Sequence, residues 1–228
     1  MKQIIKKEEY LEKIIHDLKT PATAQICALE SLLKATDSKF SKKELDLIEL
    51  TLNSCNYMKN LIDTFLNVLK LNSQKLSLNY TKFNFNELVK EVISEVNILL
   101  KYNELLLEIT SDNEIILHAD RLQIKRVIEN ILSNSIKNAY KNTTIQINIS
   151  KIGAEVCFEV QNNSPYIEPE ILKEIFNKYK THCSFYNKPS IGLGLYLSKE
   201  IINAHFGRMI AKSFADDINI FGFYLPER

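Results

Sequence analysis

The stretch that decides the fold is DRLQIKRVIENILSNSIKNAYKNTTIQINIS, residues 120–150. Its apolar side chains first recur every three or four residues, as on one face of a helix, and then alternate with polar ones, as in a strand. Asp120, with Gln123 three residues later, is typical of a helix N-terminus. The stretch therefore predicts a helix at about 120–138 and a strand within 143–150, as in a domain of mixed α and β structure.

The same mixture of element types runs from about residue 76 to the end of the chain. Further helices are expected at about 85–101, 169–177 and 194–205. The other β-rich runs are 105–110, 114–119, 155–160, 207–214 and 218–225. Strands interleaved with helices in this way predict an α+β fold: an α/β sandwich in which helices cover one face of a mixed sheet.

The first part of the chain has a different pattern. Residues 4–72 contain no glycine and one proline, and their apolar side chains recur at helical or heptad-like steps. Ser41, three residues before Glu44, has the capping-box spacing that starts a second helix. We expect two helices of about 30 residues each, and two such hairpins would close the apolar core of a dimeric four-helix bundle. The predicted domains are 1–72, a hinge at 73–79, and 80–228.

Composition excludes several classes of protein. The formal net charge of the 228 residues is +1, which gives no electrostatic reason to bind nucleic acid or an anionic membrane. No apolar run approaches the roughly 18–20 residues that cross a bilayer, and the first residues contain no signal-peptide apolar region. The four cysteines form no Cys-x-x-Cys pair, so they are either buried residues in a reducing compartment or part of a metal site. We expect a cytoplasmic protein, or the cytoplasmic part of a longer one, without membrane contact from this chain.

A proline interrupts the first predicted helix in EKIIHDLKTPATA, residues 12–24. Pro21 removes a helical hydrogen bond and frees the carbonyl of Asp17. On a helical wheel His16 and Thr20 lie one turn apart, off the apolar stripe. One interpretation is an ordinary solvated helix face. The other is an exposed nucleophile or phosphate carrier, because a neighbouring carboxylate orients the imidazole that attacks.

The predicted helix 120–138 carries a polar stripe. Its members fall within about 60° of each other on the wheel: Gln123, Asn130, Asn134 and Lys137. Two amides and a lysine can hold hydrated Mg²⁺ and phosphate oxygens, because Mg²⁺ takes few protein ligands. The alternative is an amphipathic surface helix rich in asparagine. Later in the chain, Gly192 and Gly194 would let the backbone approach phosphate at a helix start.

Taken in order, these motifs resemble those of sensor histidine kinases of two-component systems. HDLKTP (16–21) resembles their phospho-acceptor box and NILSNSIKNAY (130–140) their N box. VQNNSPYIEPEILKEIF (160–176) is similar to the G1 box, SIGLGLYLSKEIINAHFG (190–207) to the G2 box, and NIFGFYLPER (219–228) to the closing strand. Asn138 stands where the family usually has an aromatic residue. Asn162, Ser164 and Tyr166 replace an aspartate and two glycines, and the segment 177–190 lacks the glycines usual in the family's lid.

The resemblance covers about residues 5–226 and implies a dimerisation and histidine-phosphotransfer hairpin followed by an ATP-binding domain. It implies that Asn134 binds Mg²⁺, that Asn130 supports it and that Lys137 touches phosphate. Asn162 would meet the adenine amino group. The backbone that approaches phosphate would be Gly192, Leu193, Gly194 and Leu195. Lys178 and Lys180 would either meet phosphates or belong to a solvated loop.

The activity that the resemblance implies is an ATP-dependent protein-histidine kinase. His16 would accept the γ-phosphate, with Asp17 as base or orienting acid, and pass it to an aspartate on a response regulator. Thr20 would serve the reverse, phosphatase activity. The signal would come from a separate sensor protein or from the rest of a longer kinase. The rivals are a catalytically weak dimeric phosphotransfer or scaffold relative, and a stand-alone ATPase of the same nucleotide fold.

Overall fold

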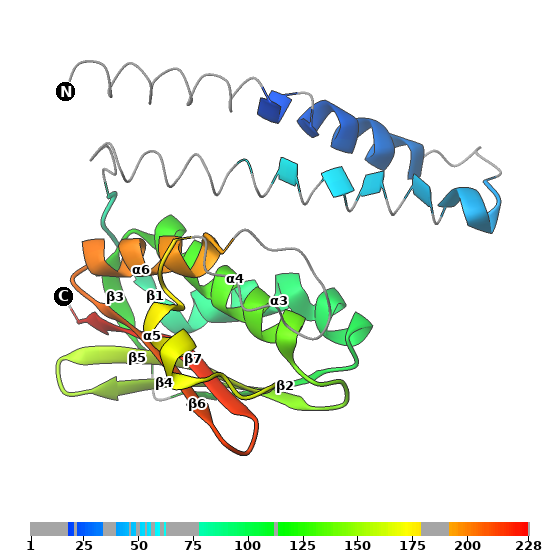
Figure 1. Cartoon of the computed structure of the whole chain (residues 1–228). Helices are drawn as coiled ribbons and strands as arrows, with labels where there is room; N and C mark the ends of the chain where they lie inside the picture. The colour runs from blue at the N-terminus through cyan, green and yellow to red at the C-terminus, as the bar shows by residue number, and fades with distance from the viewer. Residues whose placement is uncertain are drawn as a thin grey trace, which may run out of the picture. The chain divides into compact units, whose positions relative to one another are not determined.

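The structure is a computed structural model and divides into two compact units, Met1–Leu76 and Ser77–Arg228 (Figure 1). It describes residues 18–20, 22–33, 40–45, 47–48, 51–52, 54–55, 58–59, 62, 78–111, 114–178 and 192–227. Each unit is considered by itself. The predicted acceptor His16 and its neighbour Asp17 lie outside the described residues, as do Pro21, Lys180 and the predicted hinge as far as residue 77.

The described part of the first unit is helical over 18–20, 22–33 and 42–45, and at the described positions from 47 to 62. The capping box is confirmed: the Ser41 amide donates to Glu44 Oε2 (2.7 Å), and the Glu44 amide donates to Ser41 Oγ (3.4 Å). Four apolar side chains are buried here: Ala22, Ile26, Cys55 and Ile62. The dimeric four-helix bundle stays a prediction.

The second unit contains seven strands and four helices among its described residues. Their bounds are β1 (Thr81–Asn84), α3 (Phe85–Tyr102), β2 (Leu106–Ser111), β3 (Ile116–Ala119), α4 (Arg121–Asn138), β4 (Thr144–Ile152), β5 (Glu155–Asn163), α5 (Pro169–Glu174), α6 (Gly194–Ala204), β6 (Arg208–Phe214) and β7 (Ile218–Pro226). The elements predicted from the sequence are all present. Helix α5 is shorter than predicted, and the four-residue strand β1 was not expected.

A five-stranded sheet in the order β2-β4-β5-β7-β6 forms one layer of this unit. Strand β2 is parallel to β4, and the remaining neighbours are antiparallel. Helices α3, α4 and α6 lie over one face of the sheet (Figure 1). This arrangement confirms the predicted sandwich, a mixed sheet covered by helices on one face. Strands β1 and β3 form a separate antiparallel pair.

The core lies between the helices and the sheet. In β4, Ile145, Ile147 and Ile149 are buried, whereas Gln146 and Asn148 between them are exposed, as alternation along a strand requires. Three rings whose centroids are 5.2 to 6.2 Å apart join α3 to the strands: Phe85, Phe158 and Phe223. Among the described helices, none combines the length and the apolar character that crossing a bilayer requires.

The buried polar residues Asp120 and His205 connect the start of α4 to the end of α6. Asp120 caps α4 by accepting the Gln123 amide proton (3.1 Å), which confirms the predicted N-terminus. The Asp120 amide donates to Nε2 of His205 (3.0 Å), while Nδ1 lies 2.8 Å from the carbonyl of Ile201. The imidazole is therefore neutral with its proton on Nδ1. Burial lowers the pKa of His205, which keeps it in this form.

Candidate functional site

Asn130, in the polar stripe of α4, lies against the first turns of α6. Asn130, half-buried, donates from Nδ2 to Oγ of the buried Ser198 on α6 (2.8 Å). The other end of the same amide lies against Gly194, the first residue of α6, where an added Cβ would be only 2.3 Å from Oδ1 of Asn130. The structure thus brings together the N-box and G2-box segments, through Asn130 and Gly194, which are more than 60 residues apart in the chain.

The start of α6 is suited to an anion. Gly192 has φ +67°, in the left-handed region that favours glycine, and the next residue, Leu193, is buried at the N-cap. Leu193 makes no side-chain capping bond, so the N-cap residue leaves the first amides of α6, which include that of Leu195, without a side-chain acceptor of its own. Amide groups and the helix dipole at such an end favour a phosphate group.

A lysine lies beside this helix start. The ammonium group of Lys178 is 4.8 Å from the ring centroid of Tyr196, the third residue of α6. A cation–π contact of this kind holds a positive charge at the first turn, where phosphate would bind. Lys137, from the α4 stripe, is half-buried.

Asn134 is held by Asn138, one turn further along α4. Nδ2 of Asn138 donates to the backbone carbonyl of Asn134 (2.7 Å) and to its side-chain Oδ1 (3.1 Å). An amide oxygen is the hard ligand type that Mg²⁺ takes, and one such ligand suffices for a Mg²⁺ ion that arrives with ATP. The donor chemistry of Asn134 therefore fits the predicted magnesium role.

Asn162 is 1% exposed at the end of β5, and its Nδ2 has no hydrogen-bond partner among the residues that the structure describes. On α4, Oγ of the buried Ser135 likewise has none. A buried polar group without a partner costs about 1–3 kcal/mol, so a native structure normally supplies one. The orphan Nδ2 is a donor, so it fits a ligand that offers an acceptor, whereas the predicted contact with the adenine amino group would use the other end of the amide, Oδ1.

The loop after β5 takes a path that needs no glycine. Asn219, on β7, donates from Nδ2 to the carbonyl (3.2 Å) and Oγ (2.6 Å) of Ser164 and to the carbonyl of Pro165 (2.9 Å). Asp217 accepts from the amide of Tyr166 (3.0 Å). Neither Ser164 nor Tyr166 has a positive φ, so residues with a Cβ fit where the family usually has glycines.

Three supporting residues were missed in the sequence. Ser198, Asn219 and Asp217 make orienting hydrogen bonds, although none of them was predicted as a site residue. A signal existed for Asn219, since it alternates with Phe221 and Phe223 and so occupies an inward-facing position of its strand. Asp217 lies in a turn, and only the folded structure shows what it contacts.

Thr20 lies in the first unit and is exposed on a helix, as the helical wheel predicted. Its neighbours His16 and Asp17 are outside the described residues. Among the predicted site residues, the structure therefore brings Asn130 and Gly194 into contact, and the acceptor box stays a prediction.

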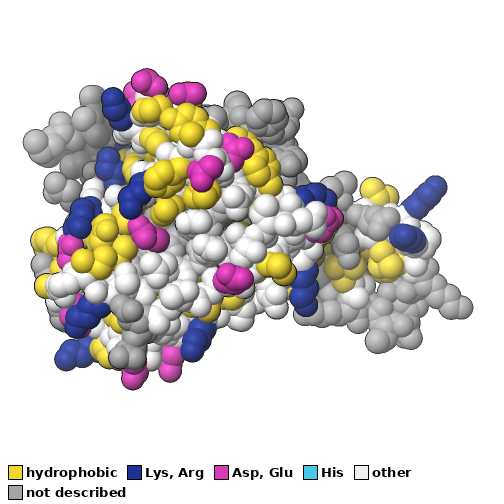
Figure 2. All heavy atoms as spheres, turned by 90° about the horizontal axis from the view of Figure 1, so that it is seen from below, with side chains coloured by type: hydrophobic (Ala, Val, Ile, Leu, Met, Phe, Trp, Pro, Cys, Tyr) yellow, Lys and Arg dark blue, Asp and Glu magenta, His cyan; other side chains and the backbone are white. Residues whose placement is uncertain are grey.

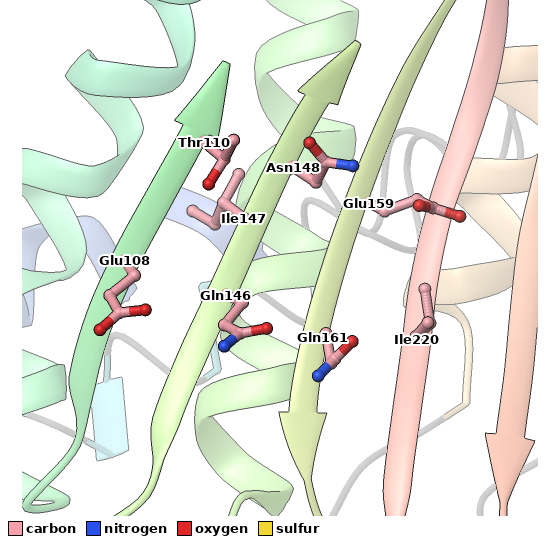
Figure 3. A pocket seen from close by; sticks show the side chains of 8 residues that line it. All are labelled: Glu108, Thr110, Gln146, Ile147, Asn148, Glu159, Gln161 and Ile220. Carbon is pink, nitrogen blue, oxygen red and sulfur yellow. The ribbon is translucent and has the colours of Figure 1, made fainter.

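A pocket of about 370 Å³ lies elsewhere, on the open face of the sheet (Figure 3). Its lining includes Gln146, Asn148 and Gln161, which point away from the helices. Uncharged polar side chains and backbone occupy much of the middle of this face (Figure 2). Because side chains alternate along a strand, this pocket is separate from the Asn130–Gly194 contact, which the chemistry favours as the site.

Comparison with known proteins agrees with this geometry. Residues 119–228 match the family described as histidine kinase-, DNA gyrase B-, and HSP90-like ATPase. The adaptive-response sensory kinase SasA of Crocosphaera subtropica is 28% identical over 226 residues, which are 96% of this chain and 59% of that protein. The chain thus spans about three fifths of the length of this curated relative.

Solved structures show the same fold. The catalytic domain of histidine kinase ThkA aligns with a TM-score of 0.59 at 28% identity, covering 65% of this chain and 96% of that one. ThkA in complex with the response regulator TrrA aligns with a TM-score of 0.63 at 21% identity over 98% of this chain and 64% of that one. Residues 119–228 therefore resemble the histidine kinase-, DNA gyrase B-, and HSP90-like ATPases, and the chain as a whole is similar to sensor histidine kinases.

Proposed function

We propose that the chain is the kinase part of a two-component sensor histidine kinase and transfers the γ-phosphate of ATP to His16. The observation that carries the proposal is the contact of Asn130 with Gly194 and Ser198. It joins a helix with amide and lysine side chains to a glycine-flanked helix start. The sensory kinase SasA, similar over nearly the whole of this chain, supports it.

In the second unit the residues have separate tasks. The amides at Gly192–Leu195 and the ammonium of Lys137 meet phosphate oxygens, and Asn162 meets the base. Asn134 holds Mg²⁺, which would neutralise phosphate charge, and Asn130 keeps α4 and α6 together through Ser198. Catalysis of this type is mainly positioning and charge neutralisation.

At the acceptor, the neutral imidazole of His16 attacks the γ-phosphorus while the bond to the bridging oxygen breaks and ADP leaves. Asp17 orients the ring and takes or stabilises its proton. The phosphoryl group then passes to an aspartate of a response-regulator receiver domain, and Thr20 orients water for the reverse, phosphatase reaction. The ThkA complex with a response regulator supports this class of partner.

The first unit acts as a homodimer, and residues 73–79 act as the hinge between the two domains. Support comes from apolar side chains that one copy leaves exposed, among them Leu18, Leu32 and Leu47. A second hairpin would bury such side chains. The phosphotransfer would take place in the cytoplasm, where ATP is available. The signal would reach this chain from a separate sensor or from further parts of the protein.

Purified protein incubated with γ-labelled ATP and Mg²⁺ tests the proposal, alongside His16→Ala and Asn134→Ala. We expect label that is acid-labile and alkali-stable, as in a phosphoramidate, and that both variants lose. Label that persists in His16→Ala would overturn the acceptor assignment.

A second candidate is a dimeric phosphotransfer or scaffold relative that no longer turns over ATP. The neutral Asn162 where the family has a charged aspartate favours it, as does the segment 177–190 without glycine. No label and no ATP binding at millimolar nucleotide would support this candidate. Sustained ATP hydrolysis without phosphoprotein would instead support a stand-alone ATPase.

A further inference from the structure

The amide group of Asn138 faces two oxygens of one residue. Its Nδ2 is 2.7 Å from the backbone carbonyl of Asn134 and 3.1 Å from Oδ1 of the same residue. A carboxamide nitrogen has two protons, so one proton serves each acceptor. Both side chains are half-buried, so a lost bond is only partly replaced by water.

This arrangement determines which end of each amide is oxygen. If Asn138 were reversed, its Oδ1 would face the carbonyl oxygen of Asn134, and two acceptors would repel each other. If Asn134 were reversed, two NH₂ groups would meet with no acceptor between them. Only the observed pairing satisfies both residues, so the helix itself orients the Asn134 amide.

We propose that Asn138 is a positioning residue that keeps Oδ1 of Asn134 turned toward the Mg²⁺ that accompanies ATP. The proposal rests on the proposed function and adds to it a residue outside the predicted set. An amide oxygen has two lone pairs. One accepts from Asn138, and the other is left for the cation. Without Asn138 the Asn134 amide can reverse, and its NH₂ group, which has no lone pair to give, would face the metal.

The test measures nucleotide binding without turnover, with a fluorescent, non-hydrolysable ATP analogue. The quantity is the ratio of the Kd in EDTA to the Kd in saturating Mg²⁺. Asn138→Leu keeps the approximate side-chain shape and removes the donor. We expect this ratio to fall about tenfold, as residues that orient a metal ligand commonly show, while the Kd in EDTA stays within about twofold of wild type.

Repeating the measurement in the variant Asn134→Asp distinguishes a positioning role of Asn138 from a purely structural one. In Asn134→Asp both terminal atoms are oxygens, so reversing the side chain changes nothing for the cation. There, Asn138→Leu should lower the ratio by less than about twofold. Ser133→Ala is the matched control, because it removes another side-chain-to-backbone bond of α4, from Oγ of Ser133 to the carbonyl of Asn130 (3.1 Å), at an exposed position.

Four results would overturn the inference. An unchanged ratio in Asn138→Leu would show that the pair does not orient the ligand. An equal loss in the wild-type and Asn134→Asp backgrounds would show a structural role only. If wild type binds nucleotide but Asn134→Ala shows the same Kd ratio as wild type, Asn134 is not the metal ligand. If wild type binds no nucleotide, the proposed function fails together with the inference.

Discussion

Gly194 and Asn130 touch so closely that a Cβ on Gly194 would lie 2.3 Å from Oδ1 of Asn130 and 3.0 Å from its Cγ. The obstructing atoms are the end of a side chain, so in Gly194→Ala the amide of Asn130 must move. Its bond to Ser198 would then break. Alanine favours a helix over glycine by about 1 kcal/mol, which offsets the lost hydrogen bond. We expect a small change in melting temperature and at least about tenfold weaker ATP binding, measured by calorimetry.

The double variant Asn130→Ala/Gly194→Ala gives the control. Since Asn130 supplies the closest atoms, the second substitution should add little to the loss caused by Asn130→Ala alone. Fully additive losses would contradict a direct clash between these two residues.

Asn162 and Asn219 form a matched pair, because they are register partners across β5 and β7 and both are buried. Within the described part of the chain, Nδ2 of Asn162 has no partner, whereas Nδ2 of Asn219 donates to three acceptors. Asn162→Leu should therefore leave the free energy of unfolding within about 0.5 kcal/mol of wild type, or raise it, and weaken ATP binding about tenfold. Asn219→Leu should cost about 1–3 kcal/mol of stability.

Denaturant titrations and binding isotherms on both variants check this contrast. If Asn162→Leu destabilised the protein as much as Asn219→Leu does, Asn162 would be a structural residue, and its role in base binding would be refuted.

His205 should make stability depend on pH. Its pKa in the folded protein is lowered, first by burial, so the unfolded chain binds a proton more readily. The contribution is fully present above the unfolded pKa near 6.5 and is lost as the pH falls below it, at up to about 1.4 kcal/mol per pH unit. Denaturant unfolding between about pH 7.5 and pH 5.5 measures the slope.

His205→Gln stays neutral over this range, so its stability should depend less on pH than that of wild type. His118→Gln, at an exposed position, is the control and should keep the wild-type slope. An identical slope in His205→Gln would show that this histidine does not carry the effect.

Thr20 and Thr23 are both described as helical, and Thr23 donates to the carbonyl of Lys19 (2.9 Å). If Thr20 orients the attacking water, Thr20→Ala should leave autophosphorylation within about twofold. The rate at which this protein dephosphorylates its receiver domain should fall by tenfold or more. This is the order of loss expected when a positioned catalytic group is removed. Thr23→Ala should change neither rate, and equal loss of both activities in Thr20→Ala would refute the assignment.

Part of the candidate site could be predicted from the sequence because its signals are local. The amide stripe of α4 follows from helical periodicity, and the helix start at Gly194 follows from two glycines before an apolar repeat. The hydrogen bonds that orient the site residues could not be predicted from the sequence. Ser198, Asp217 and Asn219 are ordinary polar residues in the sequence, and their roles depend on partners that lie far away along the chain or in a loop.

The sequence by itself determined the element types, the mixed α and β class of the second unit and the order of the nucleotide motifs, because period and capping depend on neighbours within one or two turns. Only the tertiary structure decided that Asn130 meets Gly194, that Asn162 is buried without a partner and that the loop at Ser164 needs no glycine. These features come from packing between distant elements, where burial decides the cost of a polar group and steric contact decides whether a Cβ fits.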